Sequence, residues 1–203
     1  DYIVHAAATK IVPTAEYNPI ECIKTNITGA ANLIDASRHN KVKKVVALST
    51  DKASNPINLY GATKLASDKL FIAANDGKLS STSFSVVRYG NVAGSRGSII
   101  PFFQSLKNNH YLPITDIKMT RFLIKFDDAI NIVNHCFEDM IGGEIYVKKI
   151  PSVKIIDIAK AINSKAKFKV IGVRPGEKIH EQMISSEESD YTFEYKDYFK
   201  ILP

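Results

Sequence analysis

Short apolar runs alternate along the chain with longer stretches in which apolar positions recur every three or four residues. The short runs are typical of buried β-strands and the periodic stretches of amphipathic helices. The predicted strands cover residues 2–5, 42–48, 84–88, 144–148 and 168–171. The predicted helices cover residues 17–39, 59–74, 100–107, 127–140 and 155–162, with Asn58 expected to cap the second. This alternation predicts an α/β fold: a Rossmann-like, doubly wound parallel sheet with helices on both faces.

Polar or small residues follow three consecutive predicted strands. His5 and three alanines follow the first, residues 49–52 (Ser-Thr-Asp-Lys) follow the second, and residues 89–91 (Tyr-Gly-Asn) follow the third. In open parallel sheets, ligands bind at the carboxyl ends of the strands. The sequence therefore predicts that these three strand ends meet at one ligand-binding crevice.

Composition narrows the functional class. The 203 residues, 45% of them hydrophobic, are sufficient for one large domain or a domain and a half, and no apolar run reaches membrane-spanning length. The net charge of +6 comes from scattered basic residues, which favours a solvated surface with a nucleotide-phosphate pocket over a nucleic-acid partner. Two distant cysteines, Cys22 and Cys136, predict buried free thiols in a cytoplasmic protein. The histidines and cysteines have no metal-ligand spacing, and Glu187 with Glu188 is expected to be solvated.

Tyr60 and Lys64 are four residues apart on a predicted helix and therefore share one face. A tyrosine of ordinary pKa is a poor base at neutral pH, but a neighbouring ammonium, with a nicotinamide cation beyond it, favours the phenolate and lowers that pKa. With Thr50 at the end of the preceding strand, the set suits oxidation of a hydroxyl with hydride transfer to a nicotinamide. Tyr-x-x-x-Lys also occurs by chance, so its position after a strand ending in Ser-Thr is what favours this interpretation.

Six motifs occur in order along the chain: HAAA (5–8), STDK (49–52), YGATK (60–64), RYGNV (88–92), SRGS (95–98) and RPGEK (174–178). Together they resemble the extended short-chain dehydrogenase/reductases. Within that superfamily, the chain is similar to the inverting UDP-N-acetylglucosamine 4,6-dehydratases of pseudaminic acid biosynthesis. The resemblance runs from residue 2 to about residue 202.

The resemblance implies the catalytic roles. Tyr60 takes the proton of the sugar's 4-hydroxyl with the help of Thr50 and Lys64, Lys52 is the base at carbon 5, and Asp51 is the acid that helps water leave. Desolvation and nearby positive charge would promote the neutral form of Lys52 that a base requires. From the residues alone, an exposed loop lysine paired with Asp51 is the alternative.

The resemblance also implies binding residues and partners. The cofactor is NADP, with NAD as the alternative, and the substrate is a UDP-sugar. Its implied cofactor-binding residues are His5, Ala6, Ala7, Ala8, Asn26, Tyr60, Lys64, Tyr89 and Val92. Its implied substrate-binding residues are Lys10, Asn91, Arg96, Thr115, Arg174 and Glu177. Residues 1–97 and about 122–145 would belong to the cofactor-binding domain, with 98–121 and 146–203 in a smaller nucleotide-sugar-binding domain. A homo-oligomer would form through the helices at about 17–39 and 59–74.

One expected element is missing from the sequence. None of the ten glycines forms the G-x-G-x-x-G turn that begins a dinucleotide-binding half-sheet. Either the fold binds no dinucleotide, or the first βαβ units precede Asp1; the abrupt apolar start favours truncation there. The resemblance implies that a final C-terminal stretch is absent as well. Three functions therefore remain: the dehydratase, a UDP-sugar 4-epimerase of the same fold, and a non-catalytic nucleotide-sugar-binding remnant. A truncated dehydratase chain would be inactive alone if it lacked the cofactor turn.

Overall fold

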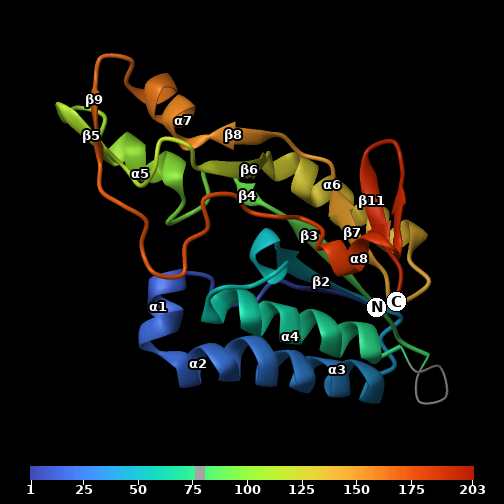
Figure 1. Cartoon of the computed structure of the whole chain (residues 1–203). Helices are drawn as coiled ribbons and strands as arrows, with labels where there is room; N and C mark the ends of the chain where they lie inside the picture. The colour runs from blue at the N-terminus through green and yellow to red at the C-terminus, as the bar shows by residue number, and fades with distance from the viewer. Residues whose placement is uncertain (76–80) are drawn as a thin grey trace.

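The computed structural model describes residues 1–75 and 81–203, and its centre is a six-stranded sheet (Figure 1). The strand order is β1-β2-β3-β7-β11-β10, in which β1, β2, β3 and β7 are parallel, β11 is antiparallel to β7, and β10 is antiparallel to β11. These strands are β1 (Tyr2–His5), β2 (Lys44–Thr50), β3 (Ser83–Tyr89), β7 (Ile145–Lys148), β10 (Thr192–Glu194) and β11 (Tyr198–Ile201). The predicted α/β fold with a parallel core is confirmed.

Helices cover both faces of this sheet. On β2, Val45 and Ala47 pack with the helices α3 (Gly29–His39) and α4 (Leu59–Ala73), whereas Val46 points to α6 (Phe126–Asp139) on the other side. Figure 1 shows α3 and α4 on one side of the sheet and α6 on the other. Because successive side chains of a strand alternate between faces, a strand buried on both faces is apolar throughout.

The predicted helix at 17–39 is divided in the structure. It consists of α2 (Pro19–Ile23), a π-helical turn η1 (Lys24–Thr28) and α3, and it is preceded by a separate short helix α1 (Val12–Tyr17) that the sequence analysis missed. Asn18 separates α1 from α2 with a non-helical backbone (φ −131°, ψ 61°). A residue before proline avoids the helical region, so Pro19 can begin α2 but Asn18 cannot continue α1.

Helix α4 begins as predicted. The Asn58 side chain accepts a hydrogen bond from the Gly61 N–H at 2.7 Å, and the predicted cap is confirmed. Gly61 lies where the helix meets η2 (Asp51–Ala53), a short 3₁₀ turn directly after β2. A Cβ at Gly61 would be 2.3 Å from the carbonyl oxygen of Lys52, so only glycine allows this approach. The close contact holds the start of α4 against the end of β2.

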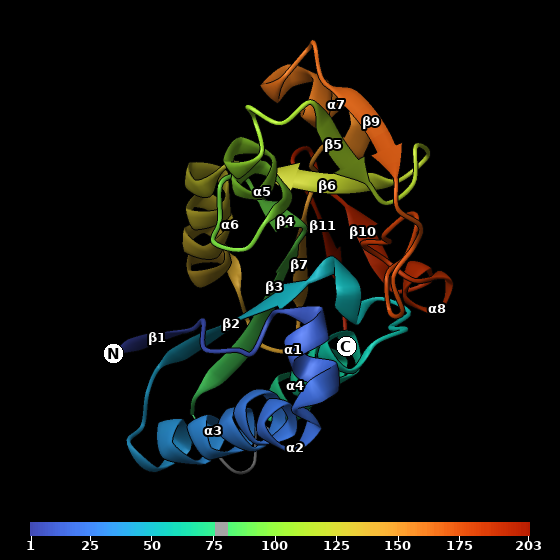
Figure 2. The same ribbon diagram turned by 90° about the vertical axis from the view of Figure 1, so that its left-hand side faces the viewer.

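A smaller group of elements lies at one end of the sheet (Figure 2). It contains β5 (Tyr111–Ile114) paired with β9 (Lys167–Val170), the three-stranded sheet β4-β6-β8, and helices α5 and α7. The remaining bounds are β4 (Asn91–Val92), β6 (Thr120–Ile124), β8 (Ser152–Lys154), α5 (Ile99–Ser105) and α7 (Ile155–Ile162). Phe103, Leu112 and Ile158 belong to its separate core. The predicted domain division stays a prediction, and the structure adds that β10 and β11 belong to the six-stranded sheet.

The last part of the chain differs most from the sequence prediction. Neither β10 and β11 nor the short helix α8 (Ser186–Ser189) was predicted. Glu188, expected to be solvated, instead forms an ion pair at 2.8 Å with Arg88 of β3, whose side chain is completely buried. The expectation was wrong because a glutamate in a polar stretch gives no sign of a distant buried partner.

Cys22 and Cys136 are both buried and free, which confirms the prediction for them. Both thiols therefore act as small apolar side chains of the core and not as a disulfide pair. Within residues 1–75 and 81–203, no helix is long and apolar enough to cross a membrane.

Candidate active site

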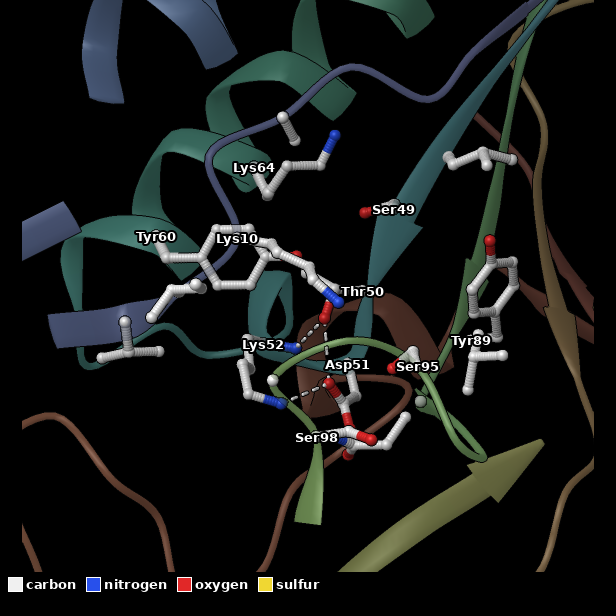
Figure 3. A pocket seen from close by; sticks show the side chains of 18 of the residues that line it. Lys10, Ser49, Thr50, Asp51, Lys52, Tyr60, Lys64, Tyr89, Ser95 and Ser98 are labelled. Atoms are coloured by element: carbon white, nitrogen blue, oxygen red, sulfur yellow. Dashed lines mark hydrogen bonds and ion pairs between the residues drawn. The ribbon is translucent and has the colours of Figure 1, made fainter. Parts of the chain in front are cut away.

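The carboxyl ends of β1, β2 and β3 open onto one cavity of about 500 Å³, as the positions of the polar residues predicted (Figure 3). The cavity is also lined by residues from the start of α4 and from the segment after β9. The predicted site residues that line it are Ala6, Ala8, Lys10, Thr50, Asp51, Lys52, Tyr60, Lys64, Tyr89, Asn91, Val92, Arg96, Arg174 and Glu177. Residues distant in the sequence are therefore brought to one hollow.

Four predicted binding residues do not line this cavity: His5, Ala7, Asn26 and Thr115. Asn26 is buried and acts on the site indirectly: its side chain accepts a hydrogen bond from the Thr9 N–H at 2.8 Å and donates to the Thr9 carbonyl at 3.1 Å. It thereby fixes the loop that carries Ala8 and Lys10. Ligand contact by these four residues stays a prediction.

The adjacent acid and amine of residues 51 and 52 share one hydrogen-bonded group with Thr50. Oδ1 of Asp51 accepts hydrogen bonds from the Thr50 hydroxyl and from Nζ of Lys52, both at 3.0 Å. The Asp51 side chain is completely buried, yet its second oxygen, Oδ2, has no hydrogen-bond partner among the described residues. A buried carboxylate oxygen without a partner is costly, so Oδ2 is available to a ligand in the cavity.

Lys52 has a second carboxylate neighbour that the sequence analysis missed. Oε1 of Glu181 lies 3.5 Å from Nζ of Lys52, and the Glu181 side chain is almost fully buried. The expected positive surroundings of Lys52 are therefore wrong: two carboxylates contact its amine, and the nearby cation, Lys178, lies on the far oxygen of Glu181 at 3.8 Å. The sequence feature that could have pointed to Glu181 is its place just after the RPGEK motif, three residues beyond Lys178.

Tyr60 and Lys64 lie on the cavity side of α4, where both side chains are buried (Figure 3). Burial raises the pKa of Tyr60 strongly; hydrogen bonding by Thr50 opposes this rise and the charge of Asp51 adds to it. Burial also lowers the pKa of Lys64, against the opposing charge of Asp68. The expected lowering of the Tyr60 pKa is thus not produced by the chain's own groups and would depend on a positive charge brought by a ligand.

Behind Lys64 is a buried group of charges. Asp68, one turn further along α4, accepts a hydrogen bond from the Ser49 hydroxyl at 2.6 Å and lies 3.7 Å from Arg88. Burial raises the pKa of Asp68, while Lys64 and Arg88 oppose that rise. Arg88 also binds both carboxylate oxygens of Glu188, at 2.8 and 2.9 Å. The buried charges behind Lys64 are therefore connected to the C-terminal part of the described chain through the contact between Arg88 and Glu188.

The other side of the cavity is basic and more open. Lys10, Arg96 and Arg174 line it, and Arg174 forms an ion pair at 2.7 Å with Glu177. The Oδ1 atom of Asn91 is buried and has no hydrogen-bond partner in the described part of the chain. Planar guanidinium groups bind phosphates with two parallel hydrogen bonds, so this side suits a phosphorylated ligand.

The sequence family described as polysaccharide biosynthesis protein matches residues 1–203. The chain belongs to this family. The predicted membership of the extended short-chain dehydrogenase/reductases is confirmed by sequence and by fold.

Two curated relatives and one solved structure are similar to this chain. An inverting UDP-N-acetylglucosamine 4,6-dehydratase of Campylobacter jejuni is 58% identical over 100% of the chain, which spans 62% of that protein. A UDP-glucose 4-epimerase of Rickettsia canadensis is 45% identical, with 99% of the chain and 61% of the relative covered. The solved structure of Pen from Bacillus thuringiensis has a TM-score of 0.95 at 39% identity and covers 100% of the chain and 66% of its own. Other solved structures of this fold, at lower identity, contain NAD or NADPH.

Proposed function

We propose that the full-length protein is a UDP-N-acetylglucosamine 4,6-dehydratase that inverts carbon 5 and yields a UDP-4-keto-6-deoxy-L-hexose for surface-glycan synthesis, such as that of pseudaminic acid. The observation that carries the proposal is the convergence of Asp51, Lys52 and Tyr60 on one cavity. Similarity to the Campylobacter dehydratase supports it, although the chain spans only 62% of that relative.

The reaction requires an acid and a base at neighbouring carbons of the sugar. Tyr60 accepts the proton of the 4-hydroxyl, and the resulting ketone acidifies the hydrogen on carbon 5. Lys52 removes that hydrogen as a proton, while Asp51 donates a proton to the 6-hydroxyl, which leaves as water. Once the planar intermediate presents its other face to the Lys52 ammonium, the proton returns to carbon 5 on that face, which inverts the carbon. A nicotinamide held beside Tyr60 and Lys64 would supply the hydride acceptor for carbon 4 and the hydride donor for carbon 6.

The direct hydrogen bond between Asp51 and Lys52 bears on how both become active. At 3.0 Å, a proton can pass from Nζ of Lys52 to Oδ1 of Asp51 without an intervening group. That single transfer gives a neutral amine, which can act as the base, and a protonated carboxyl, which can act as the acid. The ion pair is therefore compatible with catalysis, because its one shared proton activates Lys52 as the base and Asp51 as the acid.

The described residues fit a dinucleotide and a UDP-sugar. Small residues such as Ala6 and Ala8 line one side of the cavity, where a cofactor can approach the backbone closely. No residue of the described chain accepts a hydrogen bond from the Lys64 amine, which leaves it available to a ribose hydroxyl. We propose NADP as the cofactor, with NAD as the alternative, and propose that the basic side holds the diphosphate.

The same catalytic tyrosine would serve a UDP-sugar 4-epimerase, the activity named for the Rickettsia relative. An epimerase needs Tyr60 and Lys64 but no base and acid beside the sugar's carbons 5 and 6. The buried Asp51 with its free Oδ2 atom therefore favours the dehydratase. A non-catalytic remnant would have no use for this pair.

A product assay separates these functions. The full-length protein is incubated with UDP-N-acetylglucosamine and its cofactor, and the sugar nucleotide is analysed by mass spectrometry and NMR. The dehydratase loses one water and forms a 4-keto sugar; a 4-epimer of unchanged mass would support the epimerase instead. Unaltered substrate that is nevertheless bound would support the remnant.

We also propose a homo-oligomer in which α2, α3 and α4 contribute the interface. Tyr17, Ile20 and Ile23 are large apolar side chains exposed on this side of the chain, at 87%, 66% and 41% respectively. Burial of such residues against a second copy would be favourable. A cytoplasmic location remains a prediction from the unpaired cysteines.

A further inference from the structure

Glu181 is a buried carboxylate beside the reacting residues that the proposed mechanism does not use. One oxygen lies 3.5 Å from Nζ of Lys52, and the other lies 3.8 Å from Nζ of Lys178. Its side chain is 3% exposed and its Oε2 atom has no hydrogen-bond partner in the described residues. A carboxylate is seldom buried this deeply unless it is paired.

The position of Glu181 is fixed by its neighbours. Lys178 donates a hydrogen bond to the Ser54 carbonyl at 2.8 Å, and the Asn55 side chain donates to Gln182 at 2.8 Å. The Asn58 side chain also donates to a carbonyl of this segment, that of Gly176, at 2.8 Å. Residues 176–182 are therefore attached to the connection between Lys52 and α4. These contacts hold Glu181 against the Lys52 amine.

We propose that Glu181 is a positioning residue for Lys52. It keeps the amine beside Asp51 and in reach of carbon 5 of the sugar, and Lys178 balances its charge. This inference rests on the proposed dehydratase function. Because it acts through the Lys52 amine, Glu181 has its effect on the carbon 5 step and not on oxidation at carbon 4.

The charges of the four residues explain why Lys178 accompanies Glu181. With Asp51 and Glu181 ionised and both lysines protonated, the group is neutral. When a proton passes from Lys52 to Asp51, that pair becomes uncharged and the Glu181–Lys178 pair remains, so the group is again neutral. A buried group that keeps zero net charge avoids the cost of an uncompensated buried ion.

The test compares two steps within the full-length enzyme. Substrate is added in deuterium oxide; oxidation at carbon 4 is followed by the absorbance of the reduced nicotinamide, and exchange at carbon 5 by deuterium uptake into the sugar. The variant is Glu181→Gln, which keeps the size of the side chain and removes its charge. The control is Glu194→Gln, which removes the charge of an exposed ion pair with Lys149, 2.6 Å apart.

We expect Glu181→Gln to lower the ratio of carbon 5 exchange to carbon 4 oxidation at least about tenfold, because the unbalanced Lys178 repels the amine of Lys52 and displaces it. Glu194→Gln should leave the ratio unchanged. Glu181→Asp, which keeps the charge, should recover part of the loss. Since the ratio does not depend on the folded fraction, reduced folding alone cannot imitate this result.

An unchanged ratio in Glu181→Gln, or a ratio as low in Glu181→Asp as in Glu181→Gln, would overturn the positioning role. If one of the two variants does not fold, the ratio measured in the other is compared with that of the wild type. If neither folds, Glu181 has a role in stability alone and the positioning role is overturned. Absence of a 4-keto product from the wild-type enzyme would instead refute the proposed function, and the positioning role with it.

Discussion

Replacing Arg88 by methionine should destabilise the protein more than any replacement of an exposed charge. The guanidinium is completely buried and makes two hydrogen bonds to Glu188, at 2.8 and 2.9 Å, and a third to the Met183 carbonyl at 3.0 Å. It also lies 3.7 Å from the buried carboxylate of Asp68. Methionine fills much of the same volume but leaves both carboxylates without their guanidinium partner.

The magnitude follows from these contacts. Removing one partner of a buried ion pair costs about 3–5 kcal/mol. The Glu188 side chain is 17% exposed and can regain some hydration, so we expect the lower end of that range. With a urea dependence of about 2 kcal/mol per M, a loss of about 3 kcal/mol lowers the unfolding midpoint by about 1.5 M. The control Lys149→Met breaks the exposed pair with Glu194 and should cost less than about 1 kcal/mol.

The effect should shrink in acid. Burial raises the pKa of Glu188, but hydrogen bonds and charge from Arg88 outweigh it, so its pKa is below the ordinary 4.5. The stability that Glu188 contributes is therefore present above pH 4.5 and lost as the pH falls through its folded-state pKa. Burial raises the pKa of Asp68 above 3.8, so its protonation at low pH favours the folded state, and more so without Arg88.

Urea unfolding followed by circular dichroism at pH 7 and at a series of lower pH values measures both effects. A midpoint shift for Arg88→Met as small as that of Lys149→Met would refute the assignment of stability to the buried charges. A difference between wild type and variant that grows as the pH falls below 4.5 would refute the roles given to Glu188 and Asp68.

Three further predictions concern the site. Lys52→Ala should reduce carbon 5 deuterium exchange by about 100-fold or more while oxidation at carbon 4 persists; unchanged exchange would exclude Lys52 as the base. Tyr60→Phe should slow the rate at which the nicotinamide is reduced by about 10²- to 10⁴-fold. A near-normal rate would show that another group takes the 4-hydroxyl proton. Gly61→Ala should cost about 1–3 kcal/mol in urea unfolding, because its Cβ would be 2.3 Å from the Lys52 carbonyl oxygen. Gly29→Ala, whose Cβ finds only an ordinary contact at 3.6 Å, should instead gain about 0.4–1 kcal/mol, and equal effects would contradict the steric argument.

The fold was predictable from sequence where an element is buried on a regular pattern. The strands β1, β2, β3 and β7 each contain a short apolar run, and α7 (Ile155–Ile162) has the predicted bounds. The strands β10 and β11 were missed because they are short and most of their side chains are partly or fully exposed; β10 forms the edge of the sheet and β11 lies between it and β7. Periodicity reports burial, so it cannot detect an element that is little buried.

The site divides in the same way. The residues from Thr50 to Lys64 form one continuous stretch, and strand and helix periodicity are sufficient to bring them together. The pairing of Glu188 with Arg88 joins residues 100 positions apart, and no local pattern indicates it. The raised pKa of Tyr60 was also not predictable, since a neighbouring lysine is visible in the sequence but the burial that raises this pKa is not.

The two carboxylates that the sequence did not reveal act at opposite ends of the catalytic group. Glu181 contacts Lys52, and Glu188 binds Arg88, which with Lys64 offsets the burial of Asp68. Asp68 in turn opposes the lowering of the Lys64 pKa, so the charge of Lys64 depends on a chain of contacts that begins at Glu188. Because both glutamates belong to the stretch after β9, the same segment lines part of the cavity and contacts the charged residues beside it. Changes in that segment should therefore alter catalysis even where they do not contact the sugar.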